Sequence, residues 1–464
     1  MHRLQRRGLQ NQRDGPAPVP LRPDEQKGTS VRRPNILFLL PDQHRPDWLG
    51  FHPGLPLRTP HLDRLAAEGV RFTRAFCTSP LCAPSRASLA SGRRYDRCGV
   101  VGNHQDYPLD QPTYYRALRE AGYRVAGVGK FDLHKATLDW NLDGSRLIRE
   151  WGFTEGIDNE GKFDGSDSYQ RNGHRPKGPY LAFLADRGLA ESYIQEHAPE
   201  FLNSRLSAYT TCLPDDAYCD NWVAENGLTF LRGFPKGRPW HLVVNFTGPH
   251  DPMDVTEAMR ARWAGVDLPV PHHNDHSDRE GVRRRRQNYA AMIENIDRQA
   301  GRFIDLVRER GEMDDTLIVY ASDHGEMLGD HGRWGKNTWH HPSVGVPLIA
   351  SGPGVQRGLV TDALVSLHDL AATFLDCAHA GPLPEMDALT LRPLLEGRTD
   401  AHRSHVLSGL DGWRMAFDGR WKLVVGAEDA PLLFDLERDP HEDTNVAEAH
   451  PDVVDRLGRA LDSE

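Results

Sequence analysis

The sequence predicts an α/β protein of three layers, with helices on both faces of a mostly parallel sheet and a small antiparallel sheet towards the C-terminus. The first observation is a set of short, mostly apolar runs, at 35–40, 123–128, 240–246 and 316–320, of which the first is unbroken after Asn35. Runs of this kind are typical of strands buried on both faces. The second observation is that helical patterns precede the later runs, which is the alternation expected for parallel strands joined by crossover helices.

Length and composition fit a large globular protein. The chain has 464 residues, of which 38% are hydrophobic and 26% are charged, and these values exclude a wholly disordered chain. The formal net charge of −10 argues against a protein that coats nucleic acid. No apolar run approaches the roughly 20 residues of a membrane span. We therefore expect neither nucleic acid nor membrane as a partner, and the oligomeric state is left open.

The chain divides into three predicted segments. Residues 1–33 are rich in Pro, Arg and Gln and are expected to form a disordered leader. This leader has no apolar stretch of the kind found in a secretory signal, so a cytoplasmic location is expected. Residues 34–375 form the main α/β domain, with an irregular insertion at 140–220. Residues 376–464 are expected to form a smaller α+β subdomain, because short strands alternate there with turns before a terminal helix.

Three smaller expectations concern individual side chains. The six cysteines show no paired metal-finger spacing, which favours reduced and mostly buried thiols. The arginine run at 283–286 is expected to lie on a solvated helix face, because acidic residues flank it. Aromatic residues of the insertion either stack on a substrate ring or pack in the core. They are Trp140, Trp151, Tyr169 and Tyr180.

Polar side chains with metal-binding character follow the first and last of the four runs. Asp42 and Gln43 come after 35–40, and Asp323 and His324 come after 316–320. Because the carboxyl ends of parallel strands share one edge of a sheet, these residues are expected to lie together. The oxygens of Asp42, Gln43 and Asp323 suit Ca²⁺ or Mg²⁺, whereas the imidazole of His324 shifts the preference towards Mn²⁺ or Zn²⁺.

Positively charged side chains are expected at the same edge. Lys130 follows the run at 123–128, His250 follows the run at 240–246, and Lys336 lies just after the loop that carries Asp323. Together they would surround an anionic group of a substrate.

The segment Cys82-Ala83-Pro84-Ser85-Arg86 is predicted to begin a helix that ends at Gly92. Proline is tolerated in a first helical turn and glycine is common after the last one. Arg86 lies four residues after Cys82 and shares its helix face. A thiol at a helix N-terminus beside an arginine is well placed for an anion, although a simple buried cysteine at a helix start is the alternative.

This motif, with its extension from Leu89 to Arg93, closely resembles the signature of the type I sulfatases. The resemblance covers the chain from about residue 34 to the end, and implies an alkaline phosphatase-like α/β core with a small C-terminal sheet domain. Other blocks of the chain look like family blocks in family order. They are 35–43, 59–63, 128–130, 249–252, 322–326, 334–336, 346–349 and 433–440.

The resemblance implies a metal site and a modified residue. Asp42, Gln43, Asp323 and His324 would hold one divalent cation, most simply Ca²⁺, with Mg²⁺ or Mn²⁺ as alternatives. A formylglycine-generating maturation enzyme would oxidise Cys82 to Cα-formylglycine, which would be a further ligand. Its hydrated form, a geminal diol, would attack the sulfur of a small-molecule sulfate ester.

The resemblance also implies roles for the basic residues. Arg86 would hold the diol, and Lys130, His250 and Lys336 would neutralise charge on the transferred group. His250 or Lys336 would protonate the departing alcohol. Asn103 matches a position often near the active site and is a candidate for substrate binding.

The sequence departs from the commonest sulfatase pattern at three positions. Gln43 stands where many members carry Asp, and His324 stands where many carry Asn. Both variants occur in phosphonate monoester and phosphodiester hydrolases, which form the alternative function. The usual Gly-Lys-x-His is also changed, so that Asp132 replaces a histidine associated with collapse of the diol intermediate. Either Asp132 acts as the base, or His134 reaches in, or His134 is simply exposed.

A non-catalytic binding protein on this scaffold is a third reading. It would be expected to lack Asp323, Lys130 or Cys82, and all three are present. The alcohol of the ester is left open between aryl, choline-like, steroid and carbohydrate sulfates.

Overall fold

The computed structural model describes residues 33–197, 207–273 and 278–462, and its centre is an eight-stranded sheet. Its neighbouring strands run parallel except where β10 pairs with β9 and β2. Apart from Arg33, the predicted leader lies outside the described residues. From one edge to the other the strands are β11 (Leu359–Thr361), β2 (Val70–Phe72), β10 (Leu348–Ser351), β9 (Thr316–Ala321), β1 (Asn35–Pro41), β7 (Trp240–Phe246), β4 (Arg124–Gly129) and β5 (Glu155–Asp158).

The central strand β1 explains why its sequence is apolar without interruption. Ile36 and Phe38 point into one hydrophobic core, whereas Leu37 and Leu39 point into a second core on the other face. Successive side chains of a strand alternate between faces, so burial on both sides requires a continuous apolar run. All four predicted strands are confirmed to within a residue or two.

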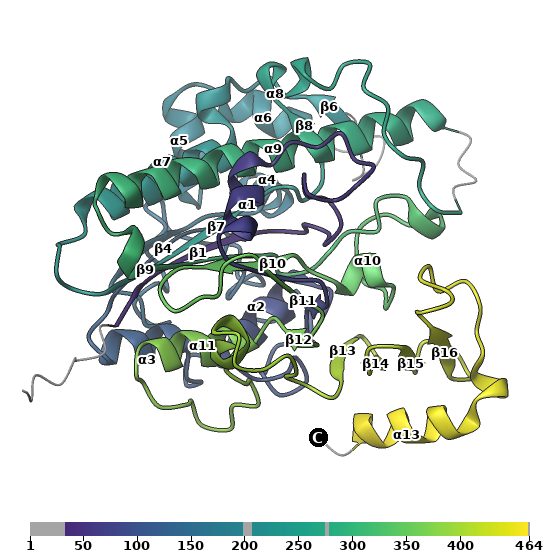
Figure 1. Ribbon diagram of the computed structural model, residues 1–464. Helices are drawn as coiled ribbons and strands as arrows, with labels where there is room; N and C mark the ends of the chain where they lie inside the picture. The colour runs from purple at the N-terminus through teal and green to yellow at the C-terminus, as the bar shows by residue number, and fades with distance from the viewer. Residues whose placement is uncertain (1–32, 198–206, 274–277, 463–464) are drawn as a thin grey trace, which may run out of the picture. The chain divides into compact units, whose positions relative to one another are not determined.

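Helices cover both faces of this sheet (Figure 1). On one face lie α1 (Pro60–Ala67), α7 (Cys219–Gly233) and α9 (Arg279–Glu309). On the other lie α2 (Cys82–Ser91), α3 (Tyr114–Glu120) and α11 (Asp369–Cys377). The predicted three-layer α/β/α arrangement is therefore confirmed.

The segment 140–220 is more regular than predicted. It contains α4 (Lys162–Arg171), α5 (Pro179–Asp186) and α6 (Ala190–Glu196), besides β5 and β6 (Ala208–Thr210). The prediction of irregular structure was wrong for these elements, because two of the glycines that suggested loops stand at helix starts. Gly161 and Gly178 occupy the N-cap positions of α4 and α5.

The aromatic side chains of this segment are buried, which favours core packing over stacking on a substrate. They are Trp140, Trp151, Tyr169 and Tyr180.

The C-terminal part forms the predicted antiparallel meander. Its strands are β13 (Val406–Leu410), β14 (Trp413–Phe417), β15 (Trp421–Val425) and β16 (Leu432–Asp435), and α13 (Pro451–Asp462) follows them. One face, including Leu423, packs against Leu457 of α13. The other face, including Met415, joins the core that contains α2. From Arg33 onward the chain forms one compact unit, and the predicted boundary at 375/376 falls inside α11.

The arginine run on α9 differs from its prediction at one position. Arg284 is exposed, but Arg286 is buried, and its Nη1 donates to the carbonyl oxygen of Leu328 at 2.8 Å. Its guanidinium also lies over the ring of Trp48. The prediction of a solvated face was therefore wrong for Arg286, because a long aliphatic stem lets arginine reach a buried carbonyl.

No helix in the described ranges has both the length and the apolar character needed to cross a bilayer. As predicted, most of the cysteines are buried: Cys77, Cys82, Cys98 and Cys219.

The smaller elements are β3 (Ala75–Phe76), β8 (Met253–Val255), α8 (Glu257–Ala261), α10 (His341–Val344), β12 (Val365–Ser366), α12 (Arg392–Leu395), and four 3₁₀ turns at Asp215–Ala217, Met313–Asp315, Asp330–Gly332 and Ala447–Ala449.

Candidate active site

Residues from distant parts of the chain meet beyond the carboxyl ends of the central strands. Asp42 directly follows β1, Lys130 directly follows β4, and Asp323 follows β9 within two residues. Since β1 pairs in parallel with β7 and β9, and β7 with β4, these strand ends share one edge of the sheet. The convergence expected from the sequence is therefore present in the structure.

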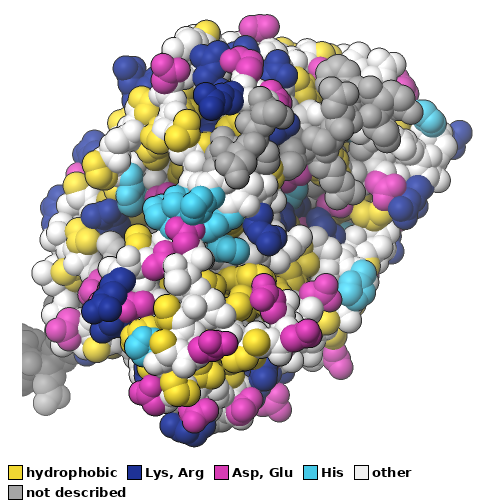
Figure 2. All heavy atoms as spheres, turned by 90° about the vertical axis from the view of Figure 1, so that its right-hand side faces the viewer, with side chains coloured by type: hydrophobic (Ala, Val, Ile, Leu, Met, Phe, Trp, Pro, Cys, Tyr) yellow, Lys and Arg dark blue, Asp and Glu magenta, His cyan; other side chains and the backbone are white. Residues whose placement is uncertain are grey.

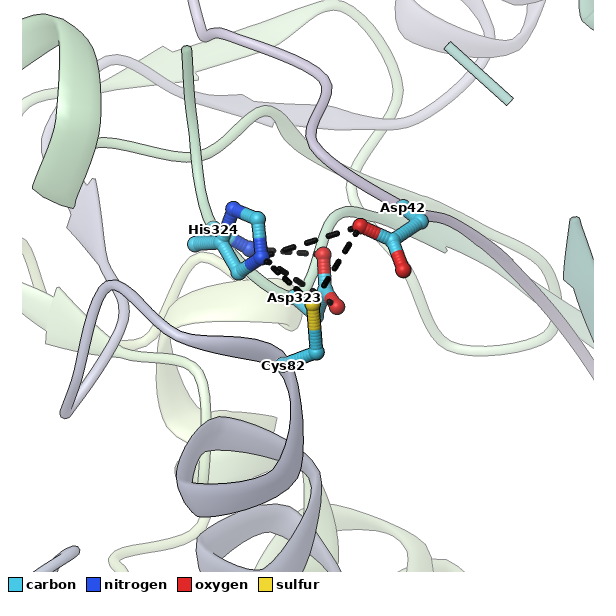
Figure 3. A group of neighbouring side chains, drawn as sticks. All are labelled: Asp42, Cys82, Asp323 and His324. Carbon is cyan, nitrogen blue, oxygen red and sulfur yellow. Dashed lines mark hydrogen bonds and ion pairs between the residues drawn. The ribbon is translucent and has the colours of Figure 1, made fainter. Parts of the chain in front are cut away.

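Four buried side chains form a group that fits a metal ion, as Figure 3 shows: Asp42, Cys82, Asp323 and His324. One ligand atom from each lies within 4.8 Å of the others. His324 Nε2 lies 3.2 Å from Cys82 Sγ, 3.6 Å from Asp42 Oδ1 and 3.7 Å from Asp323 Oδ2. Two carboxylates and one imidazole suit a divalent cation.

The orientation of His324 supports a ligand role. Its Nδ1 lies 3.0 Å from the carbonyl oxygen of Gly325, so Nδ1 carries the proton and Nε2 presents its lone pair to the group. Burial lowers the pKa of His324, although Asp323 opposes this shift. The imidazole is therefore neutral near pH 7, which is the form that binds a cation.

Helix α2 places Cys82 at its first position. Its local bonds explain the start and the end of the helix: Ala83 N donates to Asn103 Oδ1 at 3.1 Å, and Gly92 has the left-handed backbone of a helix terminus. Ser85 Oγ donates to the carbonyl oxygen of Asp323 at 2.6 Å, which joins the helix to the loop after β9. Cys82 therefore lies at the positive end of a buried helix.

Arg86 lies one turn after Cys82 and holds the two carboxylates. Its Nε is 2.9 Å from Asp323 Oδ2, and its Nη2 is 3.4 Å from Asp42 Oδ2. Nη1 donates to the carbonyl oxygen of Lys130 and to Asn245 Oδ1. The fork of the guanidinium thus fixes the spacing of Asp42 and Asp323. Its expected contact with a diol on residue 82 stays a prediction.

Two lysines approach the sulfur of Cys82. Lys130 Nζ lies 3.7 Å and Lys336 Nζ lies 3.4 Å from Sγ. Lys130 also forms an ion pair with Asp42. Burial lowers the pKa of both lysines, but nearby acidic groups outweigh it and raise the pKa above its ordinary value. Both side chains are therefore cationic.

The carboxyl of Asp42 is held ionised by the same neighbours. Burial by itself raises its pKa, but Lys130, His250, Lys336 and Arg86 together bring the pKa well below its ordinary value. A carboxylate that stays charged is a suitable ligand for a cation.

Both the nitrogen and the oxygen of the Gln43 side-chain amide form hydrogen bonds. Nε2 donates to Asp251 Oδ1 at 3.2 Å and to Glu326, and Oε1 accepts from Lys336. Asp251 and Glu326 are both buried, so an uncharged donor between them avoids the repulsion of a third carboxylate. This contact gives a physical reason for glutamine at position 43, and its role as a metal ligand stays a prediction.

Asp132 and His134 occupy different surroundings. Asp132 lies 3.1 Å from Lys130 and also pairs with Lys135. His134 is buried, so the interpretation of an exposed ring is wrong. Its nitrogens lie 3.0 Å from the carbonyl oxygen of Asp139 and 3.2 Å from Asp158. Asp132 is therefore linked to the site through Lys130, whereas these contacts turn His134 towards other residues.

A cavity of about 1120 Å³ opens beside this group. The four side chains predicted to bind substrate all line it: Asn103, Lys130, His250 and Lys336. The Nδ1 of His250 lies 2.6 Å from the carbonyl oxygen of Asp251, so it carries a proton and Nε2 is the nitrogen left for a ligand. The cavity is thus rich in cationic and hydrogen-bonding groups, as an anion requires.

Sequence reasoning missed several polar residues around the site. Lys162 lines the cavity and pairs with Asp254, and Lys135 lines it beside Asp132. Asn245 is buried and accepts from Arg86. A signal for Asn245 was available, because it is the only amide in the apolar run of β7. Lys135 and Lys162 lie in segments without such a pattern.

Comparison with known proteins agrees with this geometry. Residues 34–380 match the family model described as Sulfatase, and residues 329–463 match the model described as N-sulphoglucosamine sulphohydrolase, C-terminal. A choline-sulfatase of Rhizobium meliloti is 32% identical to the chain, covering 91% of it and 84% of the relative. An arylsulfatase of Clostridium perfringens is 28% identical, covering 93% and 94%.

A solved structure extends the similarity to the fold. The phosphonate monoester hydrolase of Agrobacterium radiobacter matches with a TM-score of 0.77 at 26% identity, covering 93% of this chain and 95% of that one. The sulfatase model spans most of the chain, and the sheet, its helices and the small C-terminal sheet follow the alkaline phosphatase-like arrangement. The chain therefore belongs to the type I sulfatases of the alkaline phosphatase-like superfamily and is a sulfuric ester hydrolase.

Proposed function

We propose that the protein hydrolyses a sulfate monoester of a small alcohol, with Cys82 converted to formylglycine by a maturation enzyme and with one divalent cation bound beside it. One observation carries this proposal. The sulfur of Cys82 has Asp42, His324, Lys130 and Lys336 within 3.7 Å, although these residues come from three separate parts of the chain. This is the position at which a nucleophile would meet both a cation and an anionic substrate.

Asp42, Asp323 and His324 would hold the cation, with an oxygen on residue 82 in the place of the sulfur and with Gln43 as a further ligand. The carboxylates favour Ca²⁺, and the imidazole also admits Mn²⁺, with Mg²⁺ as the remaining alternative. When bound, the cation supplies positive charge that favours an ionised oxygen nucleophile. Formylglycine would supply a hydrated aldehyde as the oxygen nucleophile.

The charges of the site favour an anion. Beside Cys82, Arg86, Lys130 and Lys336 supply three positive charges against the two negative charges of Asp42 and Asp323, and Asp132, which contacts Lys130, is also paired with Lys135. A bound divalent cation adds to this excess. Lys130 and Lys336 would neutralise the sulfuryl oxygens, and Arg86 would keep Asp42 and Asp323 in place.

Proton transfer is assigned to two side chains. We assign the protonation of the leaving alcohol to His250, because its Nε2 is available and its side chain lines the cavity; Lys336 is the second candidate. We assign the base that regenerates the aldehyde to Asp132, which contacts Lys130. His134 is the less favoured base, because its contacts lie with Asp139 and Asp158.

A second candidate function is hydrolysis of phosphonate monoesters or phosphodiesters. The structural similarity to the Agrobacterium radiobacter enzyme supports it, as do Gln43 and His324. The relatives that act on choline sulfate and aryl sulfates, by their names, favour sulfate as the transferred group. Choline-like and aryl alcohols are therefore the first to test, and the cytoplasmic location stays a prediction from the sequence.

Matched aryl esters distinguish these functions. Protein co-produced with a formylglycine-generating enzyme is assayed with a sulfate monoester, a phosphonate monoester and a phosphodiester, and Cys82→Ala is the control. We expect the sulfate ester to be turned over fastest, and Cys82→Ala to abolish turnover of it. Faster turnover of the phosphorus esters would favour the second function, and an active Cys82→Ala enzyme would contradict both.

A further inference from the structure

A second group of potential metal ligands lies outside the active site, on the face shown in Figure 2. His272 and His273 come from the loop before α9, and Asp443 comes from the loop after β16. Figure 2 shows histidine side chains gathered beside acidic ones on this face. None of these residues belongs to the group around Cys82.

The ligand atoms of this group converge. His272 Nε2 lies 2.9 Å from one oxygen of Asp443, and His273 Nε2 lies 3.1 Å from the other. One ligand atom from each of the three residues lies within 4.8 Å of the others. A fourth candidate is close, because His331 Nδ1 lies 3.8 Å from Asp443.

The backbone that carries these ligands is fixed by buried or partly buried bonds. His331 N donates to the carbonyl oxygen of His272 at 2.8 Å, and His272 N donates to Asp330 Oδ1 at 2.9 Å. Asp330 in turn forms an ion pair with Arg45, which lies two residues after Gln43.

The loop after β16, which carries Asp443, is also fixed by buried contacts. Glu442, next to Asp443, is buried and pairs with Lys422 of β15. Glu442 also accepts a hydrogen bond from His341 N in α10. Both halves of the ligand group are therefore held by contacts beyond the three side chains His272, His273 and Asp443.

We propose that His272, His273 and Asp443 form a second metal site, which takes a transition-metal ion such as Zn²⁺ and joins the loop before α9 to the C-terminal sheet. Two imidazoles and one carboxylate are a donor set that Zn²⁺ uses, whereas Ca²⁺ and Mg²⁺ prefer oxygen alone. The side chains of His272, His273 and Asp443 are 26%, 60% and 33% exposed, so an ion can reach them from solvent. The remaining positions would be filled by water or by His331.

The site would act as a clip near the active site. His331 lies in the turn between His324 and Lys336, so a metal ion here would restrain the loop that supplies both. The metal therefore has a structural role, and its binding can be measured without an assay of sulfate ester hydrolysis.

A pair of matched variants tests the site. His273 and His379 are both exposed histidines with left-handed backbone, and asparagine tolerates that backbone while binding Zn²⁺ poorly. Wild type, His273→Asn and His379→Asn are stripped with a chelator, reloaded with Ca²⁺ and Zn²⁺, passed through gel filtration and analysed for metal content. We expect His273→Asn to retain about one Zn²⁺ per chain less than wild type and His379→Asn.

The amount of zinc bound at the active site would be the same in all three proteins, so the difference in zinc content between them reports the second site alone. Zn²⁺ added to Ca²⁺-loaded protein should also raise the thermal midpoint of wild type and His379→Asn by several degrees, but not that of His273→Asn. Asp443→Asn should behave like His273→Asn. Equal zinc content in wild type, His273→Asn and Asp443→Asn would overturn the proposal.

Discussion

Lys336 Nζ lies 3.4 Å from the sulfur of Cys82 while it donates to the amide oxygen of Gln43. The contact joins the loop after β9 to the first residue of α2, and it brings a buried positive charge to the position of the nucleophile. Lys130, which directly follows β4, places its Nζ 3.7 Å from the same sulfur. A negative charge that develops on a group bound at residue 82 would therefore lie between two lysines.

Replacement of Lys336 by glutamine tests this relationship. The change leaves a polar group on a slightly shorter side chain and removes its charge, so kcat/KM for the sulfate ester should fall by about 10²–10³-fold. Lys236→Gln is the control, because Lys236 is exposed and far along the chain from these loops. Steady-state kinetics of the matured enzymes measure the effect, and a fall of less than about tenfold would contradict the role assigned to Lys336.

Gln43→Glu tests why an amide stands at this position. The new carboxylate would face Asp251 and Glu326, to which the amide now donates, so the free energy of unfolding should fall by about 2–4 kcal/mol at neutral pH. Burial raises the pKa of Glu326, and Asp251 raises it further. Protonation should therefore relieve the repulsion, and the loss should become smaller as the pH is lowered.

Denaturant unfolding at two pH values measures this loss, and Gln195→Glu on the exposed side of α6 is the control. The control should change stability by less than about 0.5 kcal/mol. If Gln43→Glu is as stable as wild type at neutral pH, the amide does not serve to separate the two carboxylates.

The pair Asp132→Asn and His134→Gln distinguishes the two candidate bases. Asp132→Asn removes a charge that contacts Lys130, and kcat should fall by about 10²–10⁴-fold. His134→Gln should leave kcat within about threefold of wild type but lower the free energy of unfolding by about 1–3 kcal/mol, because His134 is buried. Kinetics and thermal unfolding of both variants check the assignment, and the reverse pattern would identify His134 as the base.

Much of the fold could be predicted because burial on both faces leaves a strong trace in the sequence. The run at 35–40 is apolar at every side chain after Asn35 since both sheet faces are covered, and the meander near the C-terminus is marked by its turns. The helices at 162–196 left no such trace. Gly161 and Gly178 stand at the N-caps of α4 and α5, where the sequence alone does not separate a helix start from a loop.

Part of the site was predictable because position after a strand identified a residue. Asp42, Lys130 and Asp323 meet this condition, and the structure brings them together. Arg86 was placed correctly on α2, but its contacts with Asp42 and Asp323 depend on how α2 packs against the sheet edge. The approach of His272 to Asp443 depends in the same way on packing between distant segments, which no local pattern records.

Asp369 allows a prediction for stability in acid. This residue begins α11, is buried, and accepts from Arg403 Nε at 2.9 Å and from His402 Nε2 at 3.1 Å. Burial raises its pKa, but Arg403 and His402 outweigh burial and bring the pKa far below the ordinary value. The unfolded chain therefore binds a proton more readily than the folded protein, so this stabilisation is complete above the ordinary aspartate pKa of about 3.9 and is lost as the pH falls below it.

Asp369→Asn should lower the free energy of unfolding by about 3 kcal/mol near neutral pH. The deficit relative to wild type should shrink in acid, where wild type loses the same contribution. Denaturant midpoints across this range, with the exposed Asp411→Asn as control, measure it, and a deficit that stays constant from neutral pH to about pH 3 would show that the charge of Asp369 is not its source.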